Sequence, residues 1–214
     1  MEVKVCGMRE TDNIRDLIQL PIDYIGFIFY KKSARYVELI PTLKDSKRFK
    51  NIKKVGVFVN AEIDFILNTI KKFNLNVIQL HGKETPQYLR DLKLNCKRIN
   101  LPTIEFWKVF SIDDSFDFNE TKPYEQLADK FLFDTKTPQH GGSGQKFNWD
   151  LLNNYTGQTP FFLSGGISIA DTEGVKNVQH PQFWGLDVNS KFEITPALKD
   201  IQMLHSFLDT LGLL

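Results

Sequence analysis

The sequence predicts an α/β protein, a (β/α)8 barrel of the TIM type, and three observations lead to this fold class. Short apolar runs alternate with amphipathic stretches from one end of the 214 residues to the other. Several runs are apolar on both faces, as strands covered on both sides must be. The length suits one sizeable domain, and no linker or low-complexity tract divides the chain. We therefore expect a single barrel domain over residues 1–214; a doubly wound open sheet is the main alternative, because periodicity cannot show closure.

The predicted strands are short runs rich in β-branched or aromatic residues, each bounded by polar, glycine or proline residues. In chain order, the eight runs are Val3–Cys6, Tyr24–Phe29, Val55–Val59, Val77–Leu80, Phe106–Phe110, Phe131–Phe133, Phe161–Leu163 and Phe183–Val188.

Helical periodicity is clearest in three of the intervening stretches. Asn60 is suited to cap the N-terminus of the first stretch, and Thr85 followed by Pro86 predicts the start of the second. Apolar residues then recur three and four positions apart, which places them on one helical face. They are Ile63, Ile66, Leu67 and Ile70 in the first stretch, Leu89 and Leu92 in the second, and Leu198, Ile201, Leu204, Leu208 and Leu211 in the last.

Composition excludes several classes of function. The chain has 27 basic and 26 acidic residues and a net charge of +1, so no basic excess attracts nucleic acid or an anionic membrane. No apolar run approaches the roughly 20 residues that cross a bilayer, and the N-terminus lacks the pattern of a signal peptide. Two cysteines, Cys6 and Cys96, make no disulfide framework, and we interpret Cys96 as structural. We expect a cytoplasmic protein.

Chemically capable side chains follow the predicted strands, which is where barrel enzymes place their active sites. A thiol, a guanidinium, an imidazole and two carboxylates stand there, together with two glycine-rich turns. In chain order, they are Cys6, Arg35, His81, Asp134, the Gly141–Gly144 turn, the Gly165–Gly166 turn and Asp187. We therefore expect these groups to meet on one rim of the barrel.

Each of these side chains also has a structural interpretation. A cysteine that ends a strand is more often a small buried apolar residue, but Cys6 precedes Gly7 and faces the charged rim. Arg35 could pair with a surface carboxylate, and His81 is as easily a loop anchor as a substrate contact. Asp134 ends an apolar strand, where a carboxylate is costly unless paired or used, so we favour function there.

The glycine pair at the seventh strand predicts a phosphate site. Gly165 and Gly166 allow the backbone to approach an anion closely, and the start of a short helix follows. The loop after strand eight, with Asn189, Ser190 and Lys191, supplies further donors and a positive charge. Phosphate-binding barrels commonly use these two loops.

In their order along the chain, these residues resemble the phosphoribosylanthranilate isomerase family of tryptophan biosynthesis. The resemblance covers essentially the whole chain, and its Cys-Gly opening, Gln-Leu-His-Gly motif and Gly-Gly-x-Gly-x-x-Phe-x-Trp motif are highly specific. The matching segments are Lys4–Met8, Gly26–Phe29, Ser33–Val37, Val55–Asn60, Gln79–Glu84, Asp134, Gly141–Trp149, Leu163–Gly166 and Gly185–Glu193.

The resemblance implies an Amadori rearrangement of a phosphorylated aminosugar, N-(5-phosphoribosyl)anthranilate, without metal or cofactor. It implies that Asp134 is the general acid and Cys6 the general base; a thiol titrates near ~8.5, so we expect surrounding groups to lower the pKa of Cys6. It also implies that Arg35 binds the anthranilate carboxylate, that the Gly141–Gly144 loop covers the substrate, and that the protein is a monomer or homodimer. The implied substrate-binding residues are Arg35, His81, Gly142, Gly144 and Asp187, and the implied phosphate-binding residues are Gly165, Gly166, Asn189 and Ser190.

Three departures from the family pattern lie near the expected phosphate site. The turn after the seventh strand reads Ser-Gly-Gly-Ile where Ala-Gly-Gly-Leu is common, and Lys191 and Ala197 stand in place of glycine. Two other functions stay open. One is a different phosphosugar aldose–ketose isomerase, such as that of histidine biosynthesis, although those enzymes typically use two carboxylates. The other is a barrel that binds phosphosugars without catalysis.

Overall fold

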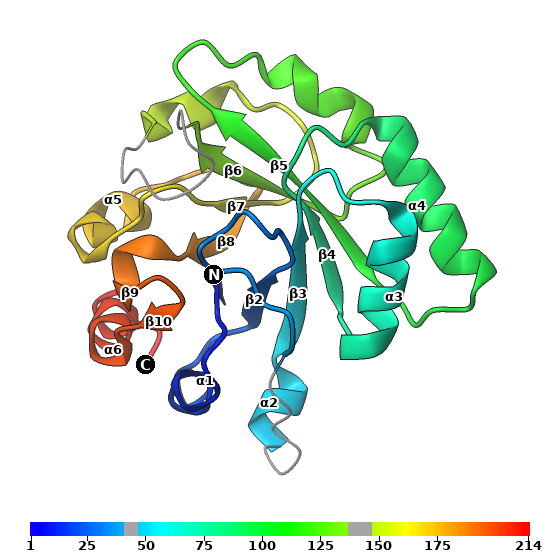
Figure 1. Cartoon of the computed structure of the whole chain (residues 1–214). Coiled ribbons are helices and arrows are strands. Elements are labelled where there is room, and N and C mark those ends of the chain that lie inside the picture. Colours follow the sequence, from blue (N-terminus) through cyan, green and yellow to red (C-terminus); the bar gives the residue numbers. More distant parts are fainter. Residues whose placement is uncertain (41–46, 137–146) are drawn as a thin grey trace.

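Eight parallel strands close into a barrel in chain order in the computed structural model, which describes residues 1–40, 47–136 and 147–214 (Figure 1). The last strand pairs with the first, with Lys4 opposite Asp187. Closure confirms the predicted barrel and excludes the open sheet. The strands are β1 Glu2–Val5, β2 Tyr24–Ile28, β3 Lys53–Phe58, β4 Val77–Leu80, β5 Glu105–Ile112, β6 Lys130–Thr135, β7 Phe161–Leu163 and β8 Phe183–Val188.

Helices surround the strands, and α6 returns to lie beside α1 (Figure 1). The connections after β5 and β6 contain the 3-10 helices η1 and η2 where a regular barrel has α-helices. Pro123, which lacks a backbone N–H, lies inside η1. The helices are α1 Thr11–Leu17, α2 Lys47–Asn51, α3 Ile63–Phe73, α4 Pro86–Arg98, η1 Phe118–Tyr124, η2 Trp149–Asn154, η3 Ile169–Asp171, α5 Thr172–Lys176, η4 Ser190–Phe192 and α6 Ile201–Thr210; a two-stranded sheet joins β9 Glu193–Thr195 to β10 Leu198–Lys199.

The prediction that Asn60 caps a helix is wrong. Helix α3 begins at Ile63, with Glu62 in the N-cap position. Asn60 instead has a positive φ of 48°, and its side-chain oxygen accepts a hydrogen bond from the Lys83 backbone N–H at 2.7 Å. Asparagine tolerates this left-handed conformation and bonds nearby backbone groups, so the residue joins two loops rather than starting a helix.

The other helix signals are closer to the structure. Thr85 caps α4, because its hydroxyl accepts a hydrogen bond from the Tyr88 N–H at 3.2 Å, and Pro86 occupies the first turn. Leu198, predicted to share the last helix, lies in β10. Strands β5 and β6 extend beyond the predicted apolar runs. Their ends carry polar residues, which the apolar pattern left out, but the backbones of these residues still pair, as Ser111 does with Asp134.

The barrel interior changes character along its axis. At the N-terminal end three aromatic side chains fill it: the Trp107 ring centroid lies 4.9 Å from that of Tyr24 and 4.7 Å from that of Phe162. Further along, the inward positions carry Lys4 and Gln79, both buried. Because successive strand residues alternate between the two faces, the outward neighbours are apolar and pack under the helices. The interior is thus aromatic at the N-terminal end of the barrel and carries polar side chains nearer the C-terminal end.

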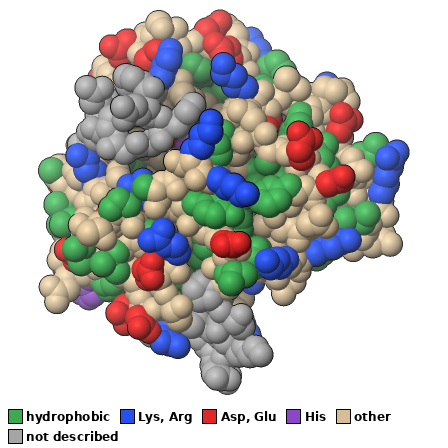
Figure 2. Space-filling view, viewed as in Figure 1, with side chains coloured by type: hydrophobic (Ala, Val, Ile, Leu, Met, Phe, Trp, Pro, Cys, Tyr) green, Lys and Arg blue, Asp and Glu red, His purple; other side chains and the backbone are tan. Residues whose placement is uncertain are grey.

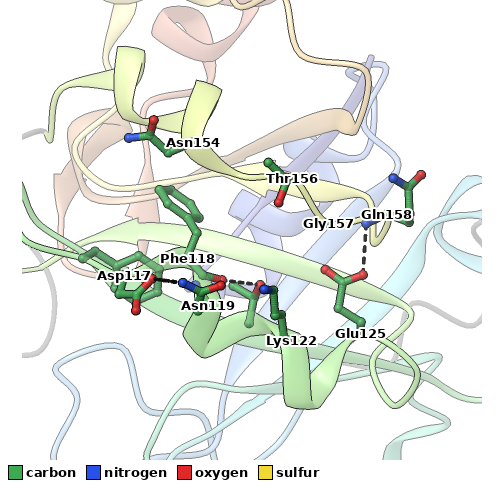
Figure 3. A pocket seen from close by; sticks show the side chains of 11 residues that line it. Asp117, Phe118, Asn119, Lys122, Glu125, Asn154, Thr156, Gly157 and Gln158 are labelled. Carbon is green, nitrogen blue, oxygen red and sulfur yellow. Dashed lines mark hydrogen bonds between the residues drawn. The ribbon is translucent and has the colours of Figure 1, made fainter.

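The outer surface carries interspersed acidic and basic side chains on the face shown in Figure 2. In the described part of the chain, no helix is long and apolar enough to cross a membrane. A groove of about 480 Å³ lies between η1 and the segment after η2, with Asp117 and Asn154 on its walls (Figure 3). The Glu125 carboxylate accepts a hydrogen bond from the Gln158 N–H at 3.0 Å at one end of this groove. None of the predicted site residues lines it.

Candidate active site

The predicted acid and base lie at the C-terminal ends of β1 and β6, on the face of each strand that points into the barrel. Cys6 belongs to the apolar cluster inside the barrel, and Leu132, two residues before Asp134, belongs to the same cluster. Residues two apart share a face, so Asp134 also points inward. Asp187 links the two positions, since its charge interacts with both Cys6 and Asp134.

Cys6 is buried, with 4% of its surface exposed. Gly26 makes room for it, because a Cβ at residue 26 would lie 2.7 Å from the Cys6 sulfur. Burial raises the pKa of the thiol, and the nearby ammonium of Lys4 offsets this only in part. The expectation that the surroundings lower the pKa of Cys6 is therefore wrong for this arrangement. The lowering groups are present, but desolvation outweighs them.

A buried ion pair between Lys4 and Asp187 lies close to the Cys6 thiol. The Lys4 Nζ lies 2.7 Å from Asp187 Oδ1, and the two side chains are 0% and 7% exposed. Burial disfavours the charged form of Lys4, but the charges of Asp187 and Cys6 more than compensate and raise its pKa. Burial likewise raises the pKa of Asp187, and Lys4 opposes that shift. Each charge in this pair is retained because of the other.

The Asp134 carboxylate faces an imidazole. His81 Nε2 lies 3.2 Å from Asp134 Oδ2, and the two side chains are 31% and 19% exposed. On the other side of the ring, Nδ1 is 3.4 Å from the side-chain nitrogen of Gln79. Gln79 is 1% exposed, and its Oε1 has no hydrogen-bond partner among the described residues. An amide, an imidazole and a carboxylate thus form a row across the rim.

The loop that carries His81 is fixed from outside the barrel. Lys108, which is 4% exposed, donates to the Gly82 carbonyl at 2.7 Å and to Glu84 Oε2 at 3.1 Å. Glu84 also accepts hydrogen bonds from the Gly82 N–H at 2.9 Å and the Asn60 N–H at 2.7 Å. A satisfied buried network of this kind is rigid, so the position of the imidazole is well defined.

Arg35 lies beside Gly7, the residue after Cys6, and its guanidinium is already partly paired. A Cβ at Gly7 would lie 2.7 Å from both Arg35 Cδ and Asn189 Oδ1, so these two side chains flank the residue after Cys6. The Arg35 guanidinium donates to both oxygens of Glu193, with its shortest bond at 2.6 Å from Nη2. Buried Lys199 then donates to Glu193 Oε1 at 2.5 Å and to Asn189 Oδ1 at 2.8 Å.

The glycine turn after β7 has a left-handed backbone. Gly165 and Gly166 have φ angles of 91° and 71°, which favour glycine. A Cβ at Gly165 would lie 2.3 Å from the Thr135 backbone nitrogen, so the turn packs directly against the end of β6. The helix after this turn is short, a single 3-10 turn followed by α5. Ser190 begins η4 on the neighbouring loop.

The two replacements of a family glycine have different consequences. Lys191 is exposed, so its side chain costs nothing in packing. Ala197 is fully buried and has a φ of 71°, a conformation in which alanine is strained and glycine is not. Its N–H donates to Glu193 Oε1 at 3.1 Å, which helps to hold the conformation.

Sequence reasoning located most of the rim but missed part of its support. The structure brings the predicted thiol, guanidinium, imidazole and carboxylates to one end of the barrel; Gly142 and Gly144 lie outside the described residues. Lys4, Gln79 and Lys199 were not predicted. Lys4 and Gln79 each stand two residues before a predicted site residue on a strand. Since alternate strand residues share a face, the sequence could have placed both inside the barrel, whereas it carried no such indication for Lys199.

Among the described residues, no group of three His, Cys, Asp or Glu side chains is placed to hold a metal ion.

Comparison with known proteins identifies relatives of the whole chain. The family model of N-(5'phosphoribosyl)anthranilate (PRA) isomerase matches residues 3–210. The chain is 44% identical over 210 residues to an N-(5'-phosphoribosyl)anthranilate isomerase of Parabacteroides distasonis, covering 97% of this chain and 92% of that protein. It is 42% identical to the protein of that name from Phocaeicola vulgatus, covering 99% and 98%.

Solved structures give the same result. The phosphoribosyl anthranilate isomerase of Thermotoga maritima superposes with a TM-score of 0.79 at 28% identity, covering 100% of both chains. A phosphoribosyl anthranilate isomerase in complex with reduced 1-(o-carboxyphenylamino)-1-deoxyribulose 5-phosphate superposes with a TM-score of 0.77 at 26% identity, covering 100% of both chains.

Proposed function

The chain belongs to the N-(5'-phosphoribosyl)anthranilate isomerase family, and we propose that Cys6 and Asp134 are the general base and general acid of its reaction. The activity is that of the family, an isomerisation of a small phosphorylated aminosugar in tryptophan biosynthesis. The observation that carries the residue assignment is the shared placement of the two groups. They point into the same end of one barrel, with Asp187 between them.

Asp134 is the acid of the first step. It gives its proton to the furanose ring oxygen of phosphoribosylanthranilate, the C–O bond breaks, and the open chain is left as a Schiff base. His81 supports this assignment because it faces the Asp134 carboxyl at 3.2 Å and can accept or donate a hydrogen bond there. A positioned acid or base contributes about 10²–10⁴ in rate.

Cys6 is the base of the second step. Its thiolate removes the proton from C2 of the Schiff base, and the resulting enolamine tautomerises to the aminoketose. No atom is gained or lost, so no oxidant, reductant or second substrate is needed. Because burial raises the pKa of Cys6, the thiolate depends on the positive charge of Lys4 beside it.

The remaining predicted residues hold the substrate. Arg35 offers a planar fork to the anthranilate carboxylate, and Asp187, with His81, faces the sugar. Donors on the loops after β7 and β8 hold the phosphate. The phosphate-binding residues of this proposal are Gly165, Gly166, Asn189 and Ser190, and the substrate-binding glycines Gly142 and Gly144 lie outside the described residues.

Purified single variants test the assignment. Cys6→Ala and Asp134→Asn should each lower kcat by about 10² or more, with circular dichroism unchanged. Cys96→Ala is the matched control for the thiol, because Cys96 is also buried and unpaired but lies in α4. Asp209→Asn, on the exposed face of α6, is the control for the carboxylate. Turnover is followed as loss of phosphoribosylanthranilate fluorescence, with the substrate generated in place. Near-normal turnover of either active-site variant would reject its role.

Turnover assays of the unmodified chain with two substrates separate the two alternative functions. A barrel that only binds phosphosugars would show no turnover in the unmodified chain. An isomerase of histidine biosynthesis would turn over that pathway's substrate, with a carboxylate as its base. A thiol at the end of β1 favours the family's own reaction.

The domain organisation, compartment and oligomeric state of the enzyme are also proposals. We infer one catalytic domain over residues 1–214, because the family match and the closed barrel extend along nearly the whole chain. Two free buried thiols fit a reducing compartment, the cytoplasm. A Thermotoga maritima relative is described as dimeric, and sedimentation of this chain would decide between monomer and homodimer.

A further inference from the structure

Gln79 is the most unusual polar side chain near the site. It lies in β4, between the strand's apolar positions, and points into the barrel on the same face as Val77. It is 1% exposed, and its Oε1 lacks a hydrogen-bond partner among the described residues. An unpaired buried carbonyl is costly, so its presence at this position requires an explanation.

The neighbour of the amide supplies one. Gln79 Nε2 lies 3.4 Å from His81 Nδ1, and His81 Nε2 lies 3.2 Å from Asp134 Oδ2. The hydrogen bond at one imidazole nitrogen decides which nitrogen carries the proton. The amide therefore acts on the carboxyl group through the ring, without touching it.

Two orientations of the amide correspond to two protonation states of Asp134. When Gln79 Nε2 donates to Nδ1, neutral His81 has its proton on Nε2 and donates it to an Asp134 carboxylate. Rotation of the amide by 180° presents Oε1 to an Nδ1–H, which leaves the Nε2 lone pair free. That lone pair accepts a hydrogen bond only from a protonated Asp134.

We propose that Gln79 is a positioning residue that acts through His81 to determine whether Asp134 holds the proton it must deliver. The inference rests on the proposed role of Asp134 as general acid. In the rotated orientation Oε1 gains the Nδ1–H donor while Nε2 gives up its contact with the ring, and the acid form of Asp134 gains an acceptor. The orientation seen here matches the carboxylate that remains after proton transfer.

Other charged groups surround this row. Asp187 of β8 interacts with both Asp134 and His81, and Lys4 neutralises Asp187 from β1. Lys108 of β5 lies behind the loop that carries His81. A substitution at residue 79 changes none of these groups. A changed pH profile therefore reports on the interactions among Gln79, His81 and Asp134, the row across the rim.

Gln79→Met is the main test, because methionine has a similar length and no hydrogen-bonding amide. We expect kcat to fall about tenfold with KM within about twofold. The alkaline limb of the kcat profile, which reports loss of the acid's proton, should move by about one unit, because the amide no longer fixes which imidazole nitrogen carries the proton. Because the substitution removes an unpaired buried carbonyl, the Tm should stay equal or rise. A merely structural role would lower the Tm together with kcat.

A double-mutant cycle tests the route through the imidazole. In a His81→Ala background, Gln79→Met should change neither kcat nor the alkaline limb any further. Thr69→Val removes a buried hydroxyl that bonds the Phe65 carbonyl within α3, and it is the control for loss of a buried polar group. An unshifted alkaline limb in Gln79→Met, or an equal shift in the His81→Ala background, would overturn the proposal.

Asp134→Asn keeps the two proposals apart. If Asp134→Asn still turns over, the role of Asp134 as acid fails. If it is inactive while Gln79→Met retains the unmodified profile, only the role of Gln79 fails.

Discussion

Lys4→Met is expected to destabilise the protein strongly, because it leaves the Asp187 carboxylate buried without its counter-charge. The ammonium and carboxylate lie 2.7 Å apart, with 0% and 7% of the side chains exposed. Water therefore cannot replace the lost partner. Methionine fills most of the lysine volume, so the effect is one of charge rather than of a cavity.

The size of the effect can be worked out from protonation. The variant can avoid a buried charge by protonating Asp187, which costs about 1.4 kcal/mol for each pH unit above its unfolded pKa of ~3.9. At pH 7 this sets a ceiling of about 4 kcal/mol, within the roughly 3–5 kcal/mol seen when a buried pair is broken. For a chain of this size the Tm should fall by about 8–16 °C.

The sign of the pH dependence follows from the same argument. In Lys4→Met the pKa of Asp187 is higher in the folded than in the unfolded protein. Its destabilising effect is then complete above the folded pKa and decreases as the pH falls toward the unfolded pKa. At pH 5 the loss should be no more than about 1.5 kcal/mol.

Urea unfolding at pH 7 and pH 5 measures both quantities, with Lys4→Met/Asp187→Asn as the matched variant. The double variant should recover most of the stability and lose the pH dependence, because neither residue of this pair then carries a charge. A loss below about 1 kcal/mol at pH 7 in Lys4→Met, or a loss equal at both pH values, would refute the reasoning.

Three further predictions concern single residues. Arg35→Lys keeps the charge but loses the planar fork, so KM should rise about tenfold with kcat nearly unchanged; an unchanged KM would assign Arg35 to holding Glu193 alone. Asn74 ends α3 in the left-handed conformation, with φ 50°, so Asn74→Ala should lose about 1 kcal/mol in urea unfolding while Asn74→Gly should not. Because burial raises the pKa of Cys6, alkylation of this thiol by iodoacetamide in a Cys96→Ala background should be slow at pH 7 and accelerate with rising pH; rapid reaction at pH 7 would contradict that shift.

Local chemistry made much of the molecule predictable. Thr85 starts α4 because a hydroxyl one residue before a helix satisfies a backbone N–H, whatever lies elsewhere in the chain. Alternation along each strand is equally local, so Cys6 and Asp134 could be placed at inward strand ends from the sequence. Asn60 was misjudged because a capping residue is equally suited to a left-handed turn, and only its partner at Lys83 decides between the two.

The tertiary structure alone decided which charges meet. Lys4 and Asp187 are 183 positions apart in sequence, and Arg35 and Glu193 are 158 apart. Their pairing follows from closure of the barrel between β1 and β8, which no local pattern encodes. The pKa of Cys6 is of the same kind, since it depends on burial and on distances to charges from other strands. Residue types and periodicity determine which groups can reach the rim, whereas their electrostatic state depends on three-dimensional distance and solvent exclusion.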